Sequence, residues 1–194
     1  MLSYKDSLKI LKETNALLEG HFILSSGLHS SQYVQCAQLL SKPHKAVEFC
    51  KSLAEKIDKE INHIDLILSP AMGGVIIGYE IGRLFKKVTI FSERVNGKFE
   101  LRRDFKIEKN SKVLIVEDVI TTGKSSLECS MLVRDAKADI VAYACLIDRS
   151  NGTSNLDKKI VSQIEINIET FTKDNLPDYL KSIPAIKPGS RELK

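Results

Sequence analysis

Apolar residues recur along this chain at two different spacings, which alternate from one segment to the next. After Pro43 they follow the 3.6-residue period of a helix, which predicts a helix over residues 44–60. Residues 64–69 instead form a short, nearly continuous apolar run that is typical of a buried strand. The same two patterns predict a short helix within residues 4–18, helices over 75–84 and 124–136, and strands over 88–91, 112–118 and 139–147.

The alternation of helices with apolar strands indicates an α/β fold, in which helices cover both faces of a central parallel sheet. Ligands of such sheets bind beyond the carboxyl ends of the strands. The loops at 70–74 and 117–125 each follow a strand, so we expect them to meet at that edge. Between two further apolar stretches, Asn96-Gly97 predicts a type I′ hairpin turn.

Composition narrows the class of protein. The chain has 194 residues, of which 43% are hydrophobic and 28% charged, and this predicts one folded domain. The net charge of +4 is modest, and the basic residues are spread along the chain and interleaved with acids, which argues against a nucleic-acid partner. No apolar run approaches the length of a membrane span. The four cysteines are scattered without zinc spacing, so we expect a reduced, cytoplasmic protein in which Cys50 and Cys145 are buried.

The segment from Lys112 to Ser126 carries the strongest chemical signal. Its apolar strand ends in Glu117 and Asp118, and a turn rich in hydroxyls and glycine precedes the next helix. Backbone N–H groups, hydroxyls and the Lys124 ammonium can hold a phosphate at a helix start. The two acids would repel that phosphate, but they can accept hydrogen bonds from neutral hydroxyls. Together these groups fit the phosphate and the diol of a ribose 5-phosphate.

Two other interpretations of this turn stay open. A Thr or Ser before a helix is an ordinary N-cap, so the turn could be purely structural. Gly123-Lys124-Ser125 also matches the end of the nucleotide-triphosphate P-loop. That motif places a glycine where this chain has Asp118, whose carboxylate would face the phosphates. No G-x-G-x-x-G motif supports a dinucleotide-binding fold.

Residues 112–126 closely resemble the phosphoribosyl diphosphate (PRPP) motif of the type I phosphoribosyltransferases. The resemblance implies that the two acids hold the ribose hydroxyls and that the loop holds the 5′-phosphate. It also implies that the small, acid-free turn 69–74 contacts the pyrophosphate, although a turn that needs glycine for its own conformation would look the same. The PRPP-binding residues implied in this way are Met72, Gly73, Glu117, Asp118, Val119, Ile120, Thr121, Thr122, Gly123, Lys124 and Ser125.

Further segments, in matching order, resemble the orotate branch of this family. They are His21–Gly27 with Ser30 and Tyr33, the turn 69–74, the basic segment 92–104, Asp148-Arg149 and the tail Pro188–Arg191. Segment 92–104 could otherwise be a solvated hairpin, and Asp148-Arg149 a surface ion pair. In that branch a mobile basic loop folds over the active site, which implies catalytic roles for Arg94 and Lys98, with Arg102 and Arg103 as further candidates. Thr121 and Arg149 are the implied orotate contacts.

The sequence departs from the branch at three places. Ser25 stands where the branch often has lysine, Met72-Gly73 stands where some members have a Tyr-Lys pair, and segment 92–104 has no histidine. The resemblance implies a type I phosphoribosyltransferase fold in a single domain of residues 1–194. A small hood, from about 1–40 plus the C-terminal segment, would cover a core of about 44–150.

The implied activity is transfer of ribose 5-phosphate from PRPP to orotate, which gives orotidine 5′-phosphate and pyrophosphate in pyrimidine (UMP) biosynthesis. Mg²⁺ is the implied cofactor, held mainly through substrate and water with no protein ligand set. The implied partner is a second copy of the chain, in a homodimer where segment 92–104 reaches the other site. Two alternatives are a PRPP-sensing regulatory protein and a phosphoribosyltransferase for another base.

Overall fold

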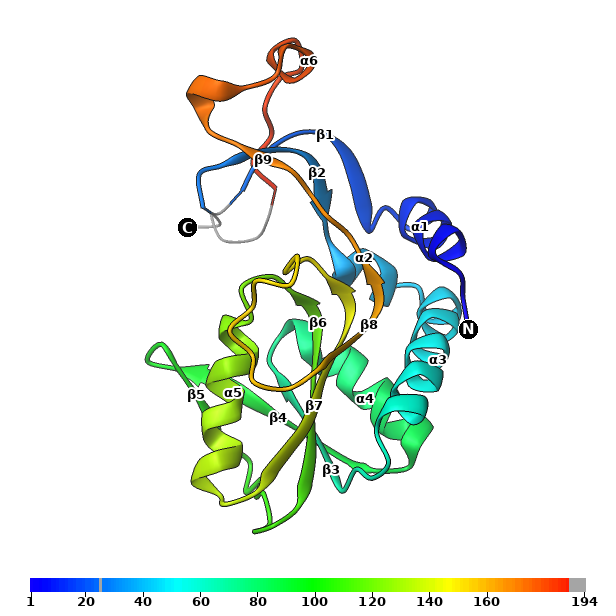
Figure 1. Ribbon diagram of the computed structural model, residues 1–194, viewed down its shortest axis with the longest axis vertical. Coiled ribbons are helices and arrows are strands. Elements are labelled where there is room, and N and C mark those ends of the chain that lie inside the picture. Colours follow the sequence, from blue (N-terminus) through cyan, green and yellow to red (C-terminus); the bar gives the residue numbers. More distant parts are fainter. Residues whose placement is uncertain (25, 189–194) are drawn as a thin grey trace.

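A six-stranded sheet in the order β5-β4-β3-β6-β7-β8 forms the core (Figure 1). All neighbouring strands run parallel except β4 and β5, which form an antiparallel hairpin. The predicted α/β fold with a central parallel sheet is therefore confirmed. The strands are β3 (Leu66–Pro70), β4 (Val88–Val95), β5 (Lys98–Leu101), β6 (Lys112–Ile120), β7 (Asp139–Asp148) and β8 (Ile160–Glu165).

The computed structural model describes residues 1–24 and 26–188. Ser25 and residues 189–191, which belong to segments used for the family resemblance, lie outside the described residues, as do residues 192–194.

Helices cover both faces of the core sheet, and each face has its own apolar core. Helices α3 (Pro43–Glu60) and α4 (Gly73–Phe85) lie on one face, and α5 (Lys124–Asp135) lies on the other (Figure 1). The apolar stripe predicted for residues 44–60 packs inward, with Phe49, Leu53 and Ile57 fully buried. A Cβ at Gly78 would collide with the Ser69 side chain, so α4 packs directly on β3. This close packing fixes the turn between β3 and α4.

The β4–β5 hairpin forms where Asn96-Gly97 predicted it. Both turn residues have left-handed φ angles, 49° for Asn96 and 84° for Gly97, as a type I′ turn requires. Strand β4 is longer than the predicted 88–91, because it runs past the end of β3 at Pro70, which pairs with Ser92. The hairpin therefore projects beyond the carboxyl edge of the core sheet.

A smaller antiparallel sheet, which we call the hood, lies over that edge (Figure 1). It contains β1 (Leu17–Ile23), β2 (His29–Val34) and β9 (Thr170–Phe171). The C-terminal segment joins it through two backbone hydrogen bonds of 2.8 Å, from Ile23 N–H to Ile186 C=O and from Ile186 N–H to His21 C=O. The remaining elements are α1 (Tyr4–Glu13), α2 (Cys36–Leu40), the 3-10 helix η1 (Lys173–Asn175) and α6 (Asp178–Lys181).

Two expectations about element boundaries were incomplete. The first helix ends at Glu13, because Asn15 adopts a left-handed φ of 58°, and the apolar Leu17 and Leu18 belong to β1. Strand β8 was not predicted at all.

Cys50 and Cys145 are buried free thiols, as expected. Among the described helices, none combines the length and the apolar character needed to cross a bilayer.

Candidate active site

Two half-buried acids, Glu117 and Asp118, lie near the end of β6 at the carboxyl edge of the core sheet. The Ser126 hydroxyl donates a 2.5 Å hydrogen bond to Glu117 Oε2, which joins α5 to the strand. Burial raises the pKa of Glu117 to about 7, although the Ser126 hydrogen bond lowers it, and the charge of Asp118 adds to the rise. Burial also raises the pKa of Asp118. Acids with raised pKa values beside an open loop are typical of a functional site.

The turn between β3 and α4 meets these acids directly. A Cβ on Gly73 would stand 2.6 Å from Asp118 Oδ1, so only glycine leaves room for the carboxylate there. The neighbouring Met72 side chain is 87% exposed. The structure thus brings the two predicted loops, 70–74 and 117–125, to the same edge of the sheet.

The hydroxyl-rich turn, residues 121–125, leads into α5, and no side chain caps the start of this helix. Its N-cap is Gly123, with a left-handed φ of 74° and no side-chain cap hydrogen bond. Thr122 Oγ1 lies 3.4 Å from the Lys124 N–H, which is too long for a strong bond. Thr121, Thr122 and Lys124 are exposed. The turn is therefore not an ordinary Thr or Ser cap, and the first N–H groups of α5 remain available to an anion.

Arg149 follows β7 beside this turn, and its backbone N–H donates a 2.8 Å hydrogen bond to Ile120 C=O. The interpretation of Asp148-Arg149 as an ion pair is wrong, because Asp148 Oδ1 instead accepts from the Ser150 N–H at 2.7 Å. The Arg149 Nε atom is buried and has no hydrogen-bond partner within the described residues. A buried donor of this kind is costly unless a ligand satisfies it.

Tyr33 of β2 and Cys36 at the start of α2 lie near Arg149, and the sequence alone did not assign them to the site as a group. Burial lowers the pKa of the Arg149 guanidinium, whereas nearby Tyr33 and Cys36 raise it. Cys36 Sγ lies 3.8 Å from the carbonyl oxygen of Asp118, so α2 contacts the end of β6. The sequence pointed to a role of Tyr33 in the site only through the resemblance of its segment to the orotate branch.

The basic segment 92–104 folds back against its own chain. Arg94 pairs with Glu128 of α5 at 2.8 Å and stacks over the Phe99 ring at 4.2 Å. Arg103 pairs with Glu93 at 2.7 Å, and Arg102 lies 3.8 Å from the same carboxylate. The Lys98 side chain is exposed and forms no hydrogen bond or ion pair with any described residue.

Hence the predicted site residues fall into two groups. Within residues 1–24 and 26–188, no hydrogen bond or ion pair links segment 92–104 to Glu117, Asp118 or the turn 121–125. The acids, the two loops and Arg149 are together at one edge. Arg94 and Lys98 are not joined to them within this chain.

Glu117→Gln is expected to stabilise the protein above neutral pH. The folded-state pKa of about 7 exceeds the ordinary 4.5, so the folded protein holds this proton more tightly than the unfolded chain does. Ionisation of Glu117 therefore lowers the free energy of unfolding progressively from pH 4.5 to 7, and the cost is constant above that range. Glutamine should raise the free energy of unfolding by about 2–3 kcal/mol at about pH 8.5 and hardly at all at about pH 4.

Urea unfolding of both proteins at the two pH values measures this difference. An effect of the same size at both pH values would mean that Glu117 is ionised normally in the folded state.

Comparison with known proteins places the chain in a family. The phosphoribosyl transferase domain family model matches residues 37–179. The orotate phosphoribosyltransferase of Erythrobacter litoralis is 46% identical over 188 residues, which cover 96% of this chain and 97% of the relative. The enzyme of the same name from Parvibaculum lavamentivorans is 47% identical over 192 residues, with 97% and 99% covered.

Solved structures share the fold. The Aeropyrum pernix orotate phosphoribosyltransferase superposes with a TM-score of 0.72 at 24% identity, over 81% of this chain and 92% of that one. The adenine phosphoribosyltransferase of Thermoanaerobacter pseudethanolicus gives 0.62 at 17% identity, over 70% and 88%. The family match and the near full-length relatives together show that this chain belongs to the orotate phosphoribosyltransferases, within the phosphoribosyl transferase domain family.

Proposed function

We propose that this protein transfers ribose 5-phosphate from PRPP to orotate, forming orotidine 5′-phosphate and pyrophosphate for pyrimidine biosynthesis. The observation that carries the proposal is the buried, unpartnered Arg149 Nε beside the turn 121–125. A planar guanidinium suits the carboxylate of orotate, which adenine, hypoxanthine and uracil lack. The relatives named orotate phosphoribosyltransferase support the same assignment.

In this proposal the edge of the core sheet holds PRPP. Glu117 and Asp118 accept hydrogen bonds from the ribose hydroxyls, and the N–H groups at the start of α5 bind the 5′-phosphate. Gly73 lets the turn after β3 approach the pyrophosphate beside Asp118. The lysine that some members carry at this position would place its Cβ 2.6 Å from Asp118 Oδ1, where the carboxylate leaves no room. Backbone N–H groups of this turn therefore replace a side-chain cation.

The reaction exchanges one bond at C1 of the ribose. The bond from C1 to the pyrophosphate oxygen breaks with its electron pair leaving on pyrophosphate, and the bond from C1 to a ring nitrogen of orotate forms. Because orotate brings an anionic ring nitrogen, the protein needs no strong general base. Its tasks are to align the two substrates and to stabilise the oxocarbenium-like transition state and the departing charge.

Mg²⁺ fits this edge through its donor chemistry. Glu117 and Asp118 supply carboxylate oxygens, which are the ligands this ion prefers. No group of three or more potential ligands is gathered anywhere in the part of the chain that the structure describes. We propose that Mg²⁺ would be held mainly by substrate oxygens and water, and that it would supply charge neutralisation for the pyrophosphate.

A homodimer is part of the proposal. Lys98, at the tip of the hairpin, is exposed and unpaired with any described residue, so it is free to serve a neighbouring site. Met72, Ile76 and Tyr79, at the start of α4, are 87%, 55% and 68% exposed, and this apolar surface beside the site supports burial against a second copy. A cytoplasmic location stays a prediction.

The test of the proposed function is an ultraviolet assay of orotate consumption with PRPP and Mg²⁺. Parallel reactions contain adenine, hypoxanthine or uracil in place of orotate. Turnover of orotate alone is the expected result. Turnover of another base would assign a different phosphoribosyltransferase activity, and PRPP binding without turnover of any base would indicate a regulatory protein.

Arg149→Lys is expected to weaken orotate binding about tenfold or more while leaving PRPP binding within about twofold. Lysine keeps the charge but lacks the planar pair of N–H donors. Calorimetric titration of each ligand into the wild type and the variant measures the two effects separately. Arg83→Lys, at the C-terminal end of α4, controls for the general effect of this substitution. An equal loss of both affinities would make Arg149 a structural residue.

A further inference from the structure

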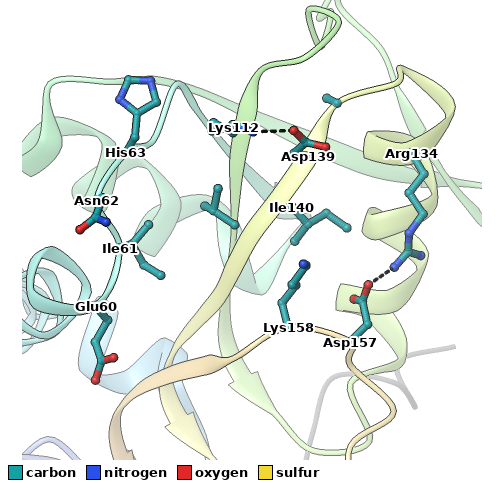
Figure 2. Close-up of a pocket in the computed structure, with 12 residues that line it drawn as sticks. Glu60, Ile61, Asn62, His63, Lys112, Arg134, Asp139, Ile140, Asp157 and Lys158 are labelled. Carbon is teal, nitrogen blue, oxygen red and sulfur yellow. Dashed lines mark hydrogen bonds and ion pairs between the residues drawn. The ribbon is translucent and has the colours of Figure 1, made fainter.

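A cavity lies at the end of the core sheet opposite the acids of β6. It has a volume of about 580 Å³, which is within the range of small-molecule sites. The ends of α3 and α5, the starts of β6 and β7, and the connection before β8 surround it (Figure 2). Its apolar surface includes Ile61 and Ile140, and its polar rim carries cations and carboxylates. The chemistry proposed above requires no such cavity.

The rim has one cation that is not committed to a neighbour. Lys112 pairs with Asp139 at 2.6 Å, and Arg134 pairs with Asp157 at 2.7 Å. Lys158 makes no hydrogen bond or ion pair with the described residues, and its side chain extends toward Ile140 (Figure 2). A ligand anion can therefore bind the Lys158 ammonium directly. It can also share the Arg134 guanidinium with the carboxylate of Asp157.

Hydrogen bonds between hydroxyl groups connect the Arg134–Asp157 pair to the protein interior. The Tyr143 hydroxyl donates a 2.9 Å hydrogen bond to Asp157 Oδ1, and Ser130 Oγ lies 2.7 Å from the same Tyr143 oxygen. Burial tends to raise the pKa of Asp157, but the hydrogen bonds from Tyr143 and Arg134 outweigh it and lower that pKa. Asp157 is therefore ionised at neutral pH, and Tyr143 must be the donor between them.

This arrangement leaves Ser130 with a choice of acceptors. Its single hydroxyl proton can point to Tyr143 Oη or to the backbone carbonyl oxygen of Ser126, which lies 2.9 Å away. Ser126 in turn donates through its own hydroxyl to Glu117 Oε2. Because both acceptors compete for one proton, the Ser130 hydroxyl can donate to only one of them at a time. A ligand that draws Arg134 from Asp157 makes Asp157 a stronger acceptor for Tyr143 and so biases that choice.

We propose that this cavity is an effector site for a ribonucleoside 5′-monophosphate. One free ammonium and one shared guanidinium match the charge of a single phosphate monoester, about −2 at neutral pH, rather than that of a triphosphate. The carboxylates of Asp139 and Glu60 on the rim can accept from ribose hydroxyls, and Ile61 and Ile140 offer an apolar surface for a base. The occupancy of the cavity is transmitted through Tyr143 and Ser130 to the site at the other edge.

Methyl NMR of the full chain, labelled at isoleucine, tests the binding. Ile61 and Ile140 report the cavity, and Ile120, next to the turn 121–125, reports the other edge. On titration with UMP, the cavity methyls should shift and saturate. Lys158→Glu should weaken that affinity about tenfold or more without moving the Ile120 titration. The charge-matched control Lys173→Glu, in η1, should titrate like the wild type.

Two further probes separate the parts of the ligand. Uridine, which lacks the phosphate, should not saturate the cavity, and inorganic phosphate should bind about tenfold or more weakly than UMP. UMP shifts confined to Ile120 would overturn the site. So would a Lys158→Glu variant that binds as tightly as the wild type, or a phosphate affinity equal to that of UMP.

Tyr143→Phe tests the transmission. In the wild type, saturating PRPP, whose binding the Ile120 methyl verifies, should change the UMP affinity at Ile140 about fivefold or more. In Tyr143→Phe the cavity should still bind UMP, but PRPP should no longer alter that affinity. Ser130→Ala should behave in the same way, and it replaces Tyr143→Phe if that variant does not fold. A wild-type UMP affinity that PRPP leaves unchanged would overturn the effector role.

Discussion

Replacing Lys98 by alanine is expected to lower kcat by about 100- to 1000-fold while leaving orotate binding nearly unchanged. Lys98 lies at the tip of the β4–β5 hairpin, exposed and without an ion pair among the described residues. If it contacts pyrophosphate, it acts chiefly in the transition state, where the charge on the leaving group grows. Arg94 is the weaker candidate, because Glu128 and Phe99 of its own chain already hold it.

Steady-state kinetics and orotate titration of Lys98→Ala measure the two quantities. Lys106→Ala removes another exposed lysine from the connection after β5 and is the matched control. A Lys98→Ala enzyme with wild-type kcat would show that the hairpin tip takes no part in the reaction.

Mixing two inactive variants tests whether the hairpin serves the neighbouring subunit. In a heterodimer of Lys98→Ala and Asp118→Asn, a hairpin acting on the neighbour produces one site with both groups and one site with neither. Mixed and exchanged subunits should therefore regain part of the activity, once mass analysis verifies the heterodimer. Heterodimers no more active than their parents would place Lys98 and Asp118 in the same subunit's site.

Asp118→Asn is expected to lower kcat/KM for PRPP by about tenfold to a hundredfold. Asparagine keeps the shape of the side chain but removes the anion that would accept from the ribose hydroxyls. Loss of folding would not explain the effect, because burial raises the pKa of Asp118 and a neutral side chain there should not lower stability above neutral pH. Kinetics with varied PRPP and urea unfolding of the same protein measure both properties.

Asp174→Asn, at an exposed position in η1, is the control for the loss of one carboxylate. If Asp118→Asn retained the kcat/KM of the wild type, the acid would be outside the substrate site. Gly73 would then need another explanation for its close approach to this carboxylate.

The sequence by itself determined the features that neighbouring residues create. The helical period after Pro43 predicted α3, and Asn96-Gly97 predicted the hairpin turn, because both depend on local spacing and backbone preference. The pair of acids followed by a hydroxyl-rich turn predicted which groups would gather at the end of β6, since these residues are contiguous. Strand β8 escaped prediction because Ser162 and Gln163 interrupt its apolar pattern, and its pairing with β7 is nonlocal.

Only the tertiary structure decided how distant segments meet. Gly73 lies against Asp118, Cys36 of α2 contacts the end of β6, and the buried Arg149 Nε is left without a partner. The structure also paired Arg94 with Glu128, and it formed the cavity around Ile61, Ile140 and Lys158 from several elements and connections that are far apart in the chain. These contacts join residues far apart in the chain, so they depend on how the helices and the hood pack on the sheet, which no local pattern of hydrophobic and polar residues specifies.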